Sequence, residues 1–325
     1  MAEVARSYHP PRRYLMGPGP SDVHPRVLAA MAQPTSGHLD PSFSQMMEEL
    51  KGLLRYAFMT KNDLTIPVSG PGSVGMESCF VNLVEPGDKV IVCQNGAFGG
   101  RMKENVERTQ RGGIPVKVDE WGADAVYSGT QKCLSCMPGL SPLTFNGKAS
   151  QVVKSRNRKI QSWFMDLGLV MSYWQGAGAR VYHHTAPINP LYSLHEALVM
   201  LQEEGLENSW ARHRKAHDGL KAGLEAMGLK FHVAEKDRLP QLNLVVVPEG
   251  CDEAKVRGRL LTEYDIEIGA GLGPLAGKVW RVGLLGQSAS ATHVTLLMAA
   301  LDHCLAGTPG IKTGVAVAAA QSKLF

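Results

Sequence analysis

The chain has 325 residues, of which 44% are hydrophobic and 20% charged, and its formal net charge is +4. These values are ordinary for a folded globular protein with room for one large and one smaller domain, and they give no argument for nucleic-acid binding. No apolar run approaches the roughly 18 residues that a membrane-spanning helix needs, so we expect no membrane segment. The polar residues 1–13 do not have the pattern of a secretory signal.

Cysteine usage and the C-terminal residues bear on the compartment. The cysteines stand mostly in apolar or helical contexts, which suggests a reducing compartment, and we expect the cytoplasm. The tripeptide Ser-Lys-Leu near the C-terminus resembles a peroxisomal signal, but such a signal must be terminal and Phe325 follows it. Cys133 and Cys136 form a C-x-x-C pair, for which no second pair is spaced to complete a zinc site. We interpret them as buried thiols and predict no metal site.

An N-terminal arm precedes the first long helix and contains the loop Gly17-Pro18-Gly19-Pro20. Asp40 then has the position of a helix N-cap, with Pro41 at the first helical position. Apolar residues recur at helical spacing over the following turns, which predicts a helix that packs on a core. These residues are Phe43, Met46, Met47, Leu50, Leu53, Leu54 and Ala57.

The next stretch alternates between strands and helices. Strands are expected at 64–68, 89–93 and 114–118, with helices at 74–84 and 101–110 between them, and this order predicts a mostly parallel sheet with helices on its faces. A further strand at 124–127 follows almost at once, although a parallel neighbour requires a crossover of about a dozen residues. Either these strands are antiparallel or a segment is missing.

The remainder of the chain has the order of a smaller α+β domain. Helices are expected at 194–204, 207–227, 252–263 and 291–304, and strands at 242–247 and 279–282. The fold class is therefore α/β with an additional α+β unit. We predict a large domain over residues 1–190, including the arm, and a small C-terminal domain over residues 191–325.

A glycine-rich loop, Gly70-Pro71-Gly72-Ser73-Val74-Gly75, stands between a predicted strand and a predicted helix. It matches the G-x-G-x-x-G pattern of dinucleotide-binding folds, but the next strand ends at Gln94 and Asn95, where that reading requires an acidic residue for the ribose. The loop still offers free N–H groups at a helix N-terminus, which suit a single phosphate. A purely structural turn stays an alternative.

Lys132 stands among small polar residues after the strand expected at 124–127, and a Pro/Gly-rich loop follows it. Imine chemistry at a lysine requires a partly desolvated setting that lowers the pKa of the amine. A lone lysine is more often a surface residue, and a lone arginine such as Arg281 is more often a surface cation.

The segment Ser-Gly-Thr-Gln-Lys-Cys around Lys132, followed by Pro-Gly-Leu-Ser-Pro, resembles the cofactor-lysine segment of class V pyridoxal-phosphate (PLP) aminotransferases, with the alanine–glyoxylate and serine–pyruvate enzymes as the nearest group. Further segments resemble that family in the same order along nearly the whole chain. They begin at Gly17, Ser69, Glu85, Asn95, Tyr182, Gly205 and Trp280.

The resemblance implies a fold type I large domain, a small C-terminal domain, a homodimer and a set of site residues. Lys132 would form the Schiff base with PLP and move the substrate's Cα proton. The other implied roles are phosphate contacts by Gly72, Ser73 and Gln131, ring stacking by Phe98, phosphate contacts from the other subunit by Tyr182 and Thr185, and substrate contacts by Gly17 and Arg281, the last as a clamp for a carboxylate.

The chain departs from the family near residue 118. There the family has further strands and helices, on the order of sixty residues or two βαβ-sized units. In the family that piece carries the aspartate that pairs with the pyridine nitrogen of PLP, and neither Asp119 nor Asp124 matches its position. His183 and His184 are adjacent on an extended segment, so we expect their side chains to point in opposite directions and to be poor metal co-ligands.

The sequence therefore predicts an aminotransferase that moves an amino group from alanine or serine to glyoxylate or pyruvate. Another class V activity, with ureidoglycine and glyoxylate or with aspartate as donor, stays open. So does a truncated, catalytically impaired relative. A nicotinamide dehydrogenase is disfavoured by Gln94 and Asn95.

Overall fold

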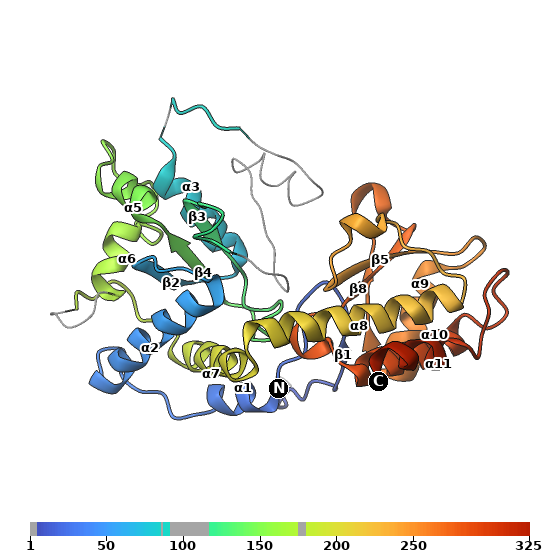
Figure 1. The fold of residues 1–325 in the computed structure, drawn as a ribbon. Coiled ribbons are helices and arrows are strands. Elements are labelled where there is room, and N and C mark those ends of the chain that lie inside the picture. The colour runs from blue at the N-terminus through green and yellow to red at the C-terminus, as the bar shows by residue number, and fades with distance from the viewer. Residues whose placement is uncertain (1–4, 86, 92–116, 175–179) are drawn as a thin grey trace.

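The computed structural model describes residues 5–85, 87–91, 117–174 and 180–325, which form two lobes (Figure 1). Each lobe contains a three-stranded sheet, and the N-terminal arm lies between the lobes. The strands are β1 (Tyr14–Leu15), β2 (Leu64–Ser69), β3 (Ala125–Tyr127), β4 (Leu140–Phe145), β5 (Leu242–Val246), β6 (Ile266–Glu267), β7 (Gly269–Ala270) and β8 (Val279–Gly283). The helices are α1 (Pro25–Met31), α2 (Pro41–Phe58), α3 (Gly72–Leu83), α5 (Gly147–Lys154), α6 (Leu167–Trp174), α7 (Ile188–Glu204), α8 (Leu206–Ala226), α9 (Glu253–Tyr264), α10 (Ala291–Cys304) and α11 (Ala316–Leu324).

The sheet of the first lobe has the strand order β2-β4-β3, and β4 is antiparallel to both neighbours. For the strand expected at 124–127, which is β3, the sequence left an antiparallel neighbour open, and the structure shows one in the downstream strand β4. Residues 89–91 are not in a strand, and the rest of the strands expected at 89–93 and 114–118 lies almost entirely outside the described residues, as does the helix expected at 101–110. Since β2 and β3 run in the same direction, their carboxyl ends lie at one edge of the sheet.

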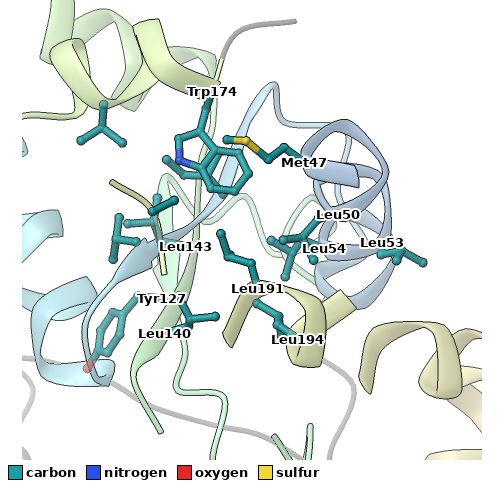
Figure 2. Close-up of a cluster of buried hydrophobic side chains, with 14 of the residues drawn as sticks. Met47, Leu50, Leu53, Leu54, Tyr127, Leu140, Leu143, Trp174, Leu191 and Leu194 are labelled. Atoms are coloured by element: carbon teal, nitrogen blue, oxygen red, sulfur yellow. The ribbon is translucent and has the colours of Figure 1, made fainter. Parts of the chain in front are cut away.

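Helices α2 and α7 cover one face of this sheet (Figure 2). Asp40 caps α2 by accepting from the amide of Ser42 at 2.8 Å, and Pro41 occupies the first turn, as the sequence predicts. Leu50 and Leu54 of α2 and Leu194 of α7 are fully buried and point toward β4. Burial of each such side chain contributes about 1.5–3 kcal/mol to the free energy of unfolding. The packing of α2 and α7 therefore stabilises the sheet.

The second lobe has its own core. Its sheet has the order β5-β8-β7, and buried residues of α8, α10 and α11 pack on it together with Met16 of the arm. The buried residues of α7 belong to the first core, whereas those of α8 from Ala216 onward belong to the second. The two hydrophobic cores therefore meet at the junction of α7 and α8, whereas the predicted domain boundary at residue 190 lies in the first turn of α7. None of the described helices is long and apolar enough to cross a membrane.

Candidate active site

The segment of residues 128–136, here called the lysine loop, follows β3 at the edge where β2 and β3 end. Its start continues the sheet, because the amide of Ser128 donates to the carbonyl of Pro142 at 2.7 Å. Thr130 is fully buried, and its hydroxyl donates to the carbonyls of Met137 at 2.6 Å and Leu140 at 3.2 Å. These bonds close the loop on itself and direct Lys132 away from the sheet.

The Lys132 side chain reaches toward the N-terminal arm. Its Nζ atom donates to the carbonyl oxygen of Pro18 at 2.6 Å. A Cβ atom placed on Gly19, which has a φ of +111°, would lie 2.5 Å from the same Nζ atom, so the arm passes directly over the amine. Burial lowers the pKa of Lys132, the positive charge of Arg281 lowers it further, and Cys133 opposes both. The neutral, nucleophilic amine is therefore more populated than in a surface lysine.

Gly17 and Arg281 lie in the same region. The amide of Gly283 donates to the carbonyl of Met16 at 2.7 Å, and a Cβ atom on Gly283 would lie 1.8 Å from the carbonyl oxygen of Gly17, so only glycine permits this close approach of the arm to β8. Arg281 is half-buried, and its Nε atom donates to the carbonyl of Ala270 at 2.5 Å. The structure thus brings Gly17, Lys132 and Arg281 together from the arm, the first lobe and the second lobe.

The glycine-rich loop lies at the same edge of the sheet. A Cβ atom on Gly75 would lie 1.9 Å from the hydroxyl oxygen of Ser141, so α3 begins tightly packed on β4. Gly72 and Ser73 form the first turn of α3, whose N-cap Pro71 supplies no side-chain acceptor. Since amides of the first helical turn have no intrahelical partner, they can bind an anion.

Gln131 adds a second hydrogen-bonding group at this edge. Within the described residues its Oε1 atom is buried without a hydrogen-bond partner, while the side chain lies over Gly129. An unpaired buried amide is costly and is readily satisfied by a ligand. Because the two ends of a side-chain amide exchange by a simple rotation, the same group can present donors to a phosphate.

The remaining predicted site residues lie elsewhere. Tyr182 is 55% exposed, its hydroxyl is 3.3 Å from that of the exposed Thr185, and its ring lies 5.2 Å from that of His38, so neither residue belongs to the group around Lys132. Phe98 lies outside the described residues.

A hydrogen-bonded chain that the sequence analysis missed connects the start of the glycine-rich loop to the segment with Tyr182. Ser69 Oγ lies 2.8 Å from His184 Nε2, and His184 Nδ1 lies 2.8 Å from His183 Nδ1. The expectation that the two histidine rings point apart is therefore wrong, because this segment is not a regular strand. Among the described residues, no group of three or more histidine, cysteine or acidic side chains is placed to hold a metal ion.

The two surviving aspartates lie at the opposite end of β3. Asp119 accepts hydrogen bonds from the Thr60 hydroxyl and, at 3.0 Å, from the Lys61 amide. Asp124, which precedes β3, accepts from Asn146 at 2.9 Å and Lys148 at 3.0 Å. Both carboxylates therefore stand at the amino end of β3, whereas the lysine loop follows its carboxyl end.

Comparison with known proteins shows the family to which the chain belongs. Residues 108–280, more than half of the chain, match the family described as aminotransferase class-V. The chain belongs to the class V aminotransferases. It is 35% identical to alanine–glyoxylate aminotransferase of Rattus norvegicus, over 90% of this chain and 89% of the rat protein. It is 32% identical to (S)-ureidoglycine–glyoxylate transaminase of Bacillus subtilis, over 95% of each chain.

Solved structures of the family have the same fold. The crystal structure of ureidoglycine–glyoxylate aminotransferase from Bacillus subtilis superposes with a TM-score of 0.92 at 33% identity, over 98% of this chain and 99% of that one. Alanine–glyoxylate aminotransferase from Nostoc sp. gives 0.88 at 38% identity, over 93% and 98% of the two chains. The predicted α/β fold of type I and the predicted family are thereby confirmed.

The class V relatives are longer than this chain. The alignment with the rat protein extends over 367 positions, whereas 90% of this chain is about 293 residues. About 74 residues of the rat protein are therefore aligned with gaps in this chain. A surplus of this size agrees with the two βαβ-sized units that the sequence analysis found missing near residue 118.

Proposed function

We propose that this class V aminotransferase is a PLP-dependent homodimer that moves an amino group from alanine or serine to glyoxylate or pyruvate. The observation that carries the proposal is the setting of Lys132, a half-buried amine with a lowered pKa, held between the arm and Arg281. The names of the relatives supply the substrate class, since both alanine–glyoxylate and ureidoglycine–glyoxylate enzymes use glyoxylate.

The residues present fit PLP at two of its ends. Lys132 would hold the aldehyde end. Gly72, Ser73 and Gln131 would hold the phosphate, because two first-turn amides and a side-chain amide whose oxygen is buried without a partner lie at the same sheet edge as the lysine. When bound, PLP supplies the electron sink that stabilises negative charge at the substrate's Cα. The contact to the pyridine nitrogen stays unassigned, because Asp119 and Asp124 stand at the other end of β3.

The chain's own residues account for substrate binding and proton transfer. The bond to the Ala270 carbonyl uses the Nε atom of Arg281. The two terminal guanidinium nitrogens would bind the substrate carboxylate, which their planar geometry suits. Gly17, which lies against Gly283 of β8, would contribute a backbone contact to the substrate. The neutral Nζ of Lys132 would accept the Cα proton of the amino donor as a general base. The protonated amine would deliver a proton to the Cα atom of the amino acid that is formed from the acceptor, as a general acid.

The homodimer is supported by exposed apolar side chains around Tyr182. Trp163, Phe164 and Val181 are 59%, 38% and 60% exposed, and His183 links them because its ring stacks on Trp163 at 4.2 Å. A continuous apolar patch of this kind marks a protein interface. A second copy seated here would place Tyr182 and Thr185 at the partner's phosphate site.

The first experiment is a visible absorption spectrum of the purified chain with added PLP, followed by borohydride reduction and peptide mapping. We expect a visible absorption band from the conjugated imine, and a reduced adduct on Lys132. Lys132→Arg is the matched control and is expected to give neither. An unmodified Lys132 in the wild-type chain would contradict the proposal.

The second experiment is an activity assay with alanine, serine, aspartate and ureidoglycine as donors and with glyoxylate and pyruvate as acceptors. Alanine or serine with glyoxylate should give the highest kcat/KM. A preference for ureidoglycine would instead identify the activity printed for the Bacillus subtilis relative. A chain that forms the Lys132 adduct but turns over no donor would be the catalytically impaired relative, for which the position of Asp119 and Asp124 argues.

A further inference from the structure

Two adjacent residues of the arm, Ser21 and Asp22, contact the lysine loop and the second lobe respectively. Ser21 is fully buried, and its amide donates to the carbonyl of Gln131 at 3.0 Å. Its hydroxyl donates to the carbonyl of Lys132 at 2.7 Å and lies 3.2 Å from that of Ser135. Two of these hydrogen bonds fix the backbone of the lysine loop to Ser21, and the third joins Ser21 to the Ser135 side chain.

Asp22 points the other way. One carboxylate oxygen accepts from the amide of Leu15 at 3.0 Å, and the other lies 2.6 Å from His293 Nε2 on the first turn of α10. The side chains of Asp22 and His293 are only 22% and 14% exposed, so solvent screens this pair less than a surface ion pair. The second ring nitrogen of His293 lies 2.7 Å from the hydroxyl of Ser290, the N-cap of α10. His293 is thereby held in one orientation.

The same arm carries the groups that face the amine. Pro18, whose carbonyl accepts from Lys132 Nζ, lies between Leu15 and Asp22, the two residues joined by the carboxylate. The Asp22–Leu15 bond thus closes a loop over residues 15–22, and the His293 bond fixes that loop to α10. Arg281 is in the same lobe as His293. The distance between the lysine and the arginine therefore depends on where the arm is held.

The lysine loop has room to move if the arm is released. A cavity of about 220 Å³ lies behind it, lined by Cys133, Leu134 and Ser135 on one side and by Arg212 and Gln287 on the other. The lysine loop is also bonded to the second lobe through the Gln287 amide, which donates to the Ser135 hydroxyl at 2.8 Å. The arm has further bonds to this lobe, among them those from the Ser288 hydroxyl to the Leu15 carbonyl at 2.8 Å and from the Gly283 amide to the Met16 carbonyl at 2.7 Å.

We propose that Asp22 and His293 are positioning residues for Lys132: their bond fixes the arm on α10, and the arm in turn sets the place of the Lys132 amine between Pro18 and Arg281. The inference rests on the proposed function only in that Lys132 is the reactive lysine. Neither residue touches substrate or cofactor, so both act through the arm.

The test measures Lys132 itself, without cofactor. Competitive acetylation of the apoprotein over a pH series, with mass spectrometry of the Lys132 peptide, gives the pH midpoint of its amine. Arg281 and Cys133 are the titratable groups that face it, and both are kept unchanged. In Asp22→Ala and His293→Ala we expect the midpoint to rise by about one pH unit, because a released arm hydrates the amine. The double variant should equal either single one, because both remove the same bond.

The controls separate positioning from general damage. Glu263→Gln removes an ion pair with Arg259 in the same lobe and should leave the midpoint unchanged. Asp22→Asn keeps an acceptor for the Leu15 amide and should shift the midpoint less than Asp22→Ala. If the alanine variants do not fold, Asp22→Asn and His293→Asn are measured in their place. In holoprotein, the dissociation constant for PLP should rise about tenfold in the same variants.

A midpoint that is the same in wild type, Asp22→Asn, Asp22→Ala and His293→Ala overturns the inference. Failure of the wild-type chain to bind PLP would count against the proposed function alone, because the acetylation midpoint does not depend on the cofactor. Equal shifts in Glu263→Gln and Asp22→Ala would also overturn it, since the effect would then be a general loosening of the lobe.

Discussion

The backbone amide of Gly286 donates a hydrogen bond to the Nε2 atom of His213, 3.1 Å away, and this bond joins α8 to the turn that contacts the lysine loop. The other ring nitrogen of His213 lies 2.6 Å from the carbonyl oxygen of Ser209. Nδ1 must therefore carry the proton and Nε2 must accept, so the neutral ring is the form that satisfies both partners. Burial, the largest cause, lowers the pKa of His213 in agreement with this.

Acid should weaken the protein through His213. Its folded-state pKa lies below the ordinary value of 6.5, so the unfolded chain binds the proton first as the pH falls, and stability present above pH 6.5 is lost below it. We expect the melting temperature to fall between pH 7.5 and 5.5, and to fall less steeply in His213→Gln. Some pH dependence of the melting temperature should remain in His213→Gln, because burial also lowers the pKa of His184 and His217. If the melting temperatures of wild type and His213→Gln fall equally steeply with pH, His213 does not contribute.

Substitution of Gly286 should displace the lysine loop. Gly286 has a φ of +53°, and a Cβ atom there would lie 2.0 Å from the Ser135 hydroxyl and 2.8 Å from the Cys133 carbonyl. Gly286→Ala is expected to lower the free energy of unfolding by about 1–3 kcal/mol and to weaken PLP binding. Gly258→Ala is the matched control, since Gly258 lies in α9 with open space around it, and should stabilise by about 0.5–1 kcal/mol. Urea unfolding of both variants measures the difference.

Removal of the Lys132 amine should stabilise the fold. The half-buried amine lies near Arg281, and its pKa is lowered, so the folded state disfavours the charged form. Lys132→Met keeps the aliphatic part of the side chain and is expected to raise the free energy of unfolding at pH 7 by about 1 kcal/mol, as is common for functional residues. The gain should shrink above the ordinary lysine pKa, where neither state is charged. A loss of stability in Lys132→Met would argue for a structural role.

Disruption of the apolar patch should separate the proposed dimer. Val181→Asp introduces a charge beside Trp163 and Phe164, and sedimentation velocity is expected to show a monomer. Val315→Asp, at an exposed valine of the second lobe, should leave the mass unchanged. PLP affinity should fall only in the first variant, because Tyr182 and Thr185 would no longer reach the partner's phosphate. A wild-type monomer would contradict the proposed assembly.

Local patterns in the sequence predict the longer helices and the glycine-rich loop, but not the short helices α1, α5, α6 and α11. Asp40 with Pro41 sets the start of α2, and the apolar spacing over 291–304 corresponds to the full extent of α10. These signals are local, because caps and helical periodicity depend on residues within a few positions. The confirmed family rests on a longer ordered set of segments.

Long-range contacts could not be predicted in the same way. The acceptor of Lys132 is the backbone carbonyl of Pro18, and every residue has such a carbonyl. The pairing of β3 with the downstream β4, and the place of α7 in the first core, depend on which surfaces meet in three dimensions. The contact between His183 and His184 requires an irregular backbone that neighbouring residue types do not specify.

The turn over residues 117–123 has a consequence for how the family tolerates changes in length. Its backbone closes on itself, with the amide of Trp121 bonded to the carbonyl of Lys117 at 2.9 Å, and the Trp121 side chain is 54% exposed. Because β3 takes its register from β4, none of the pairs in this sheet depends on the number of residues before Asp124. Each doubling of a connection costs only about 0.6 kcal/mol in closure entropy. We therefore expect the fold to accept additional residues between Trp121 and Gly122, with Lys132 keeping its place relative to the arm.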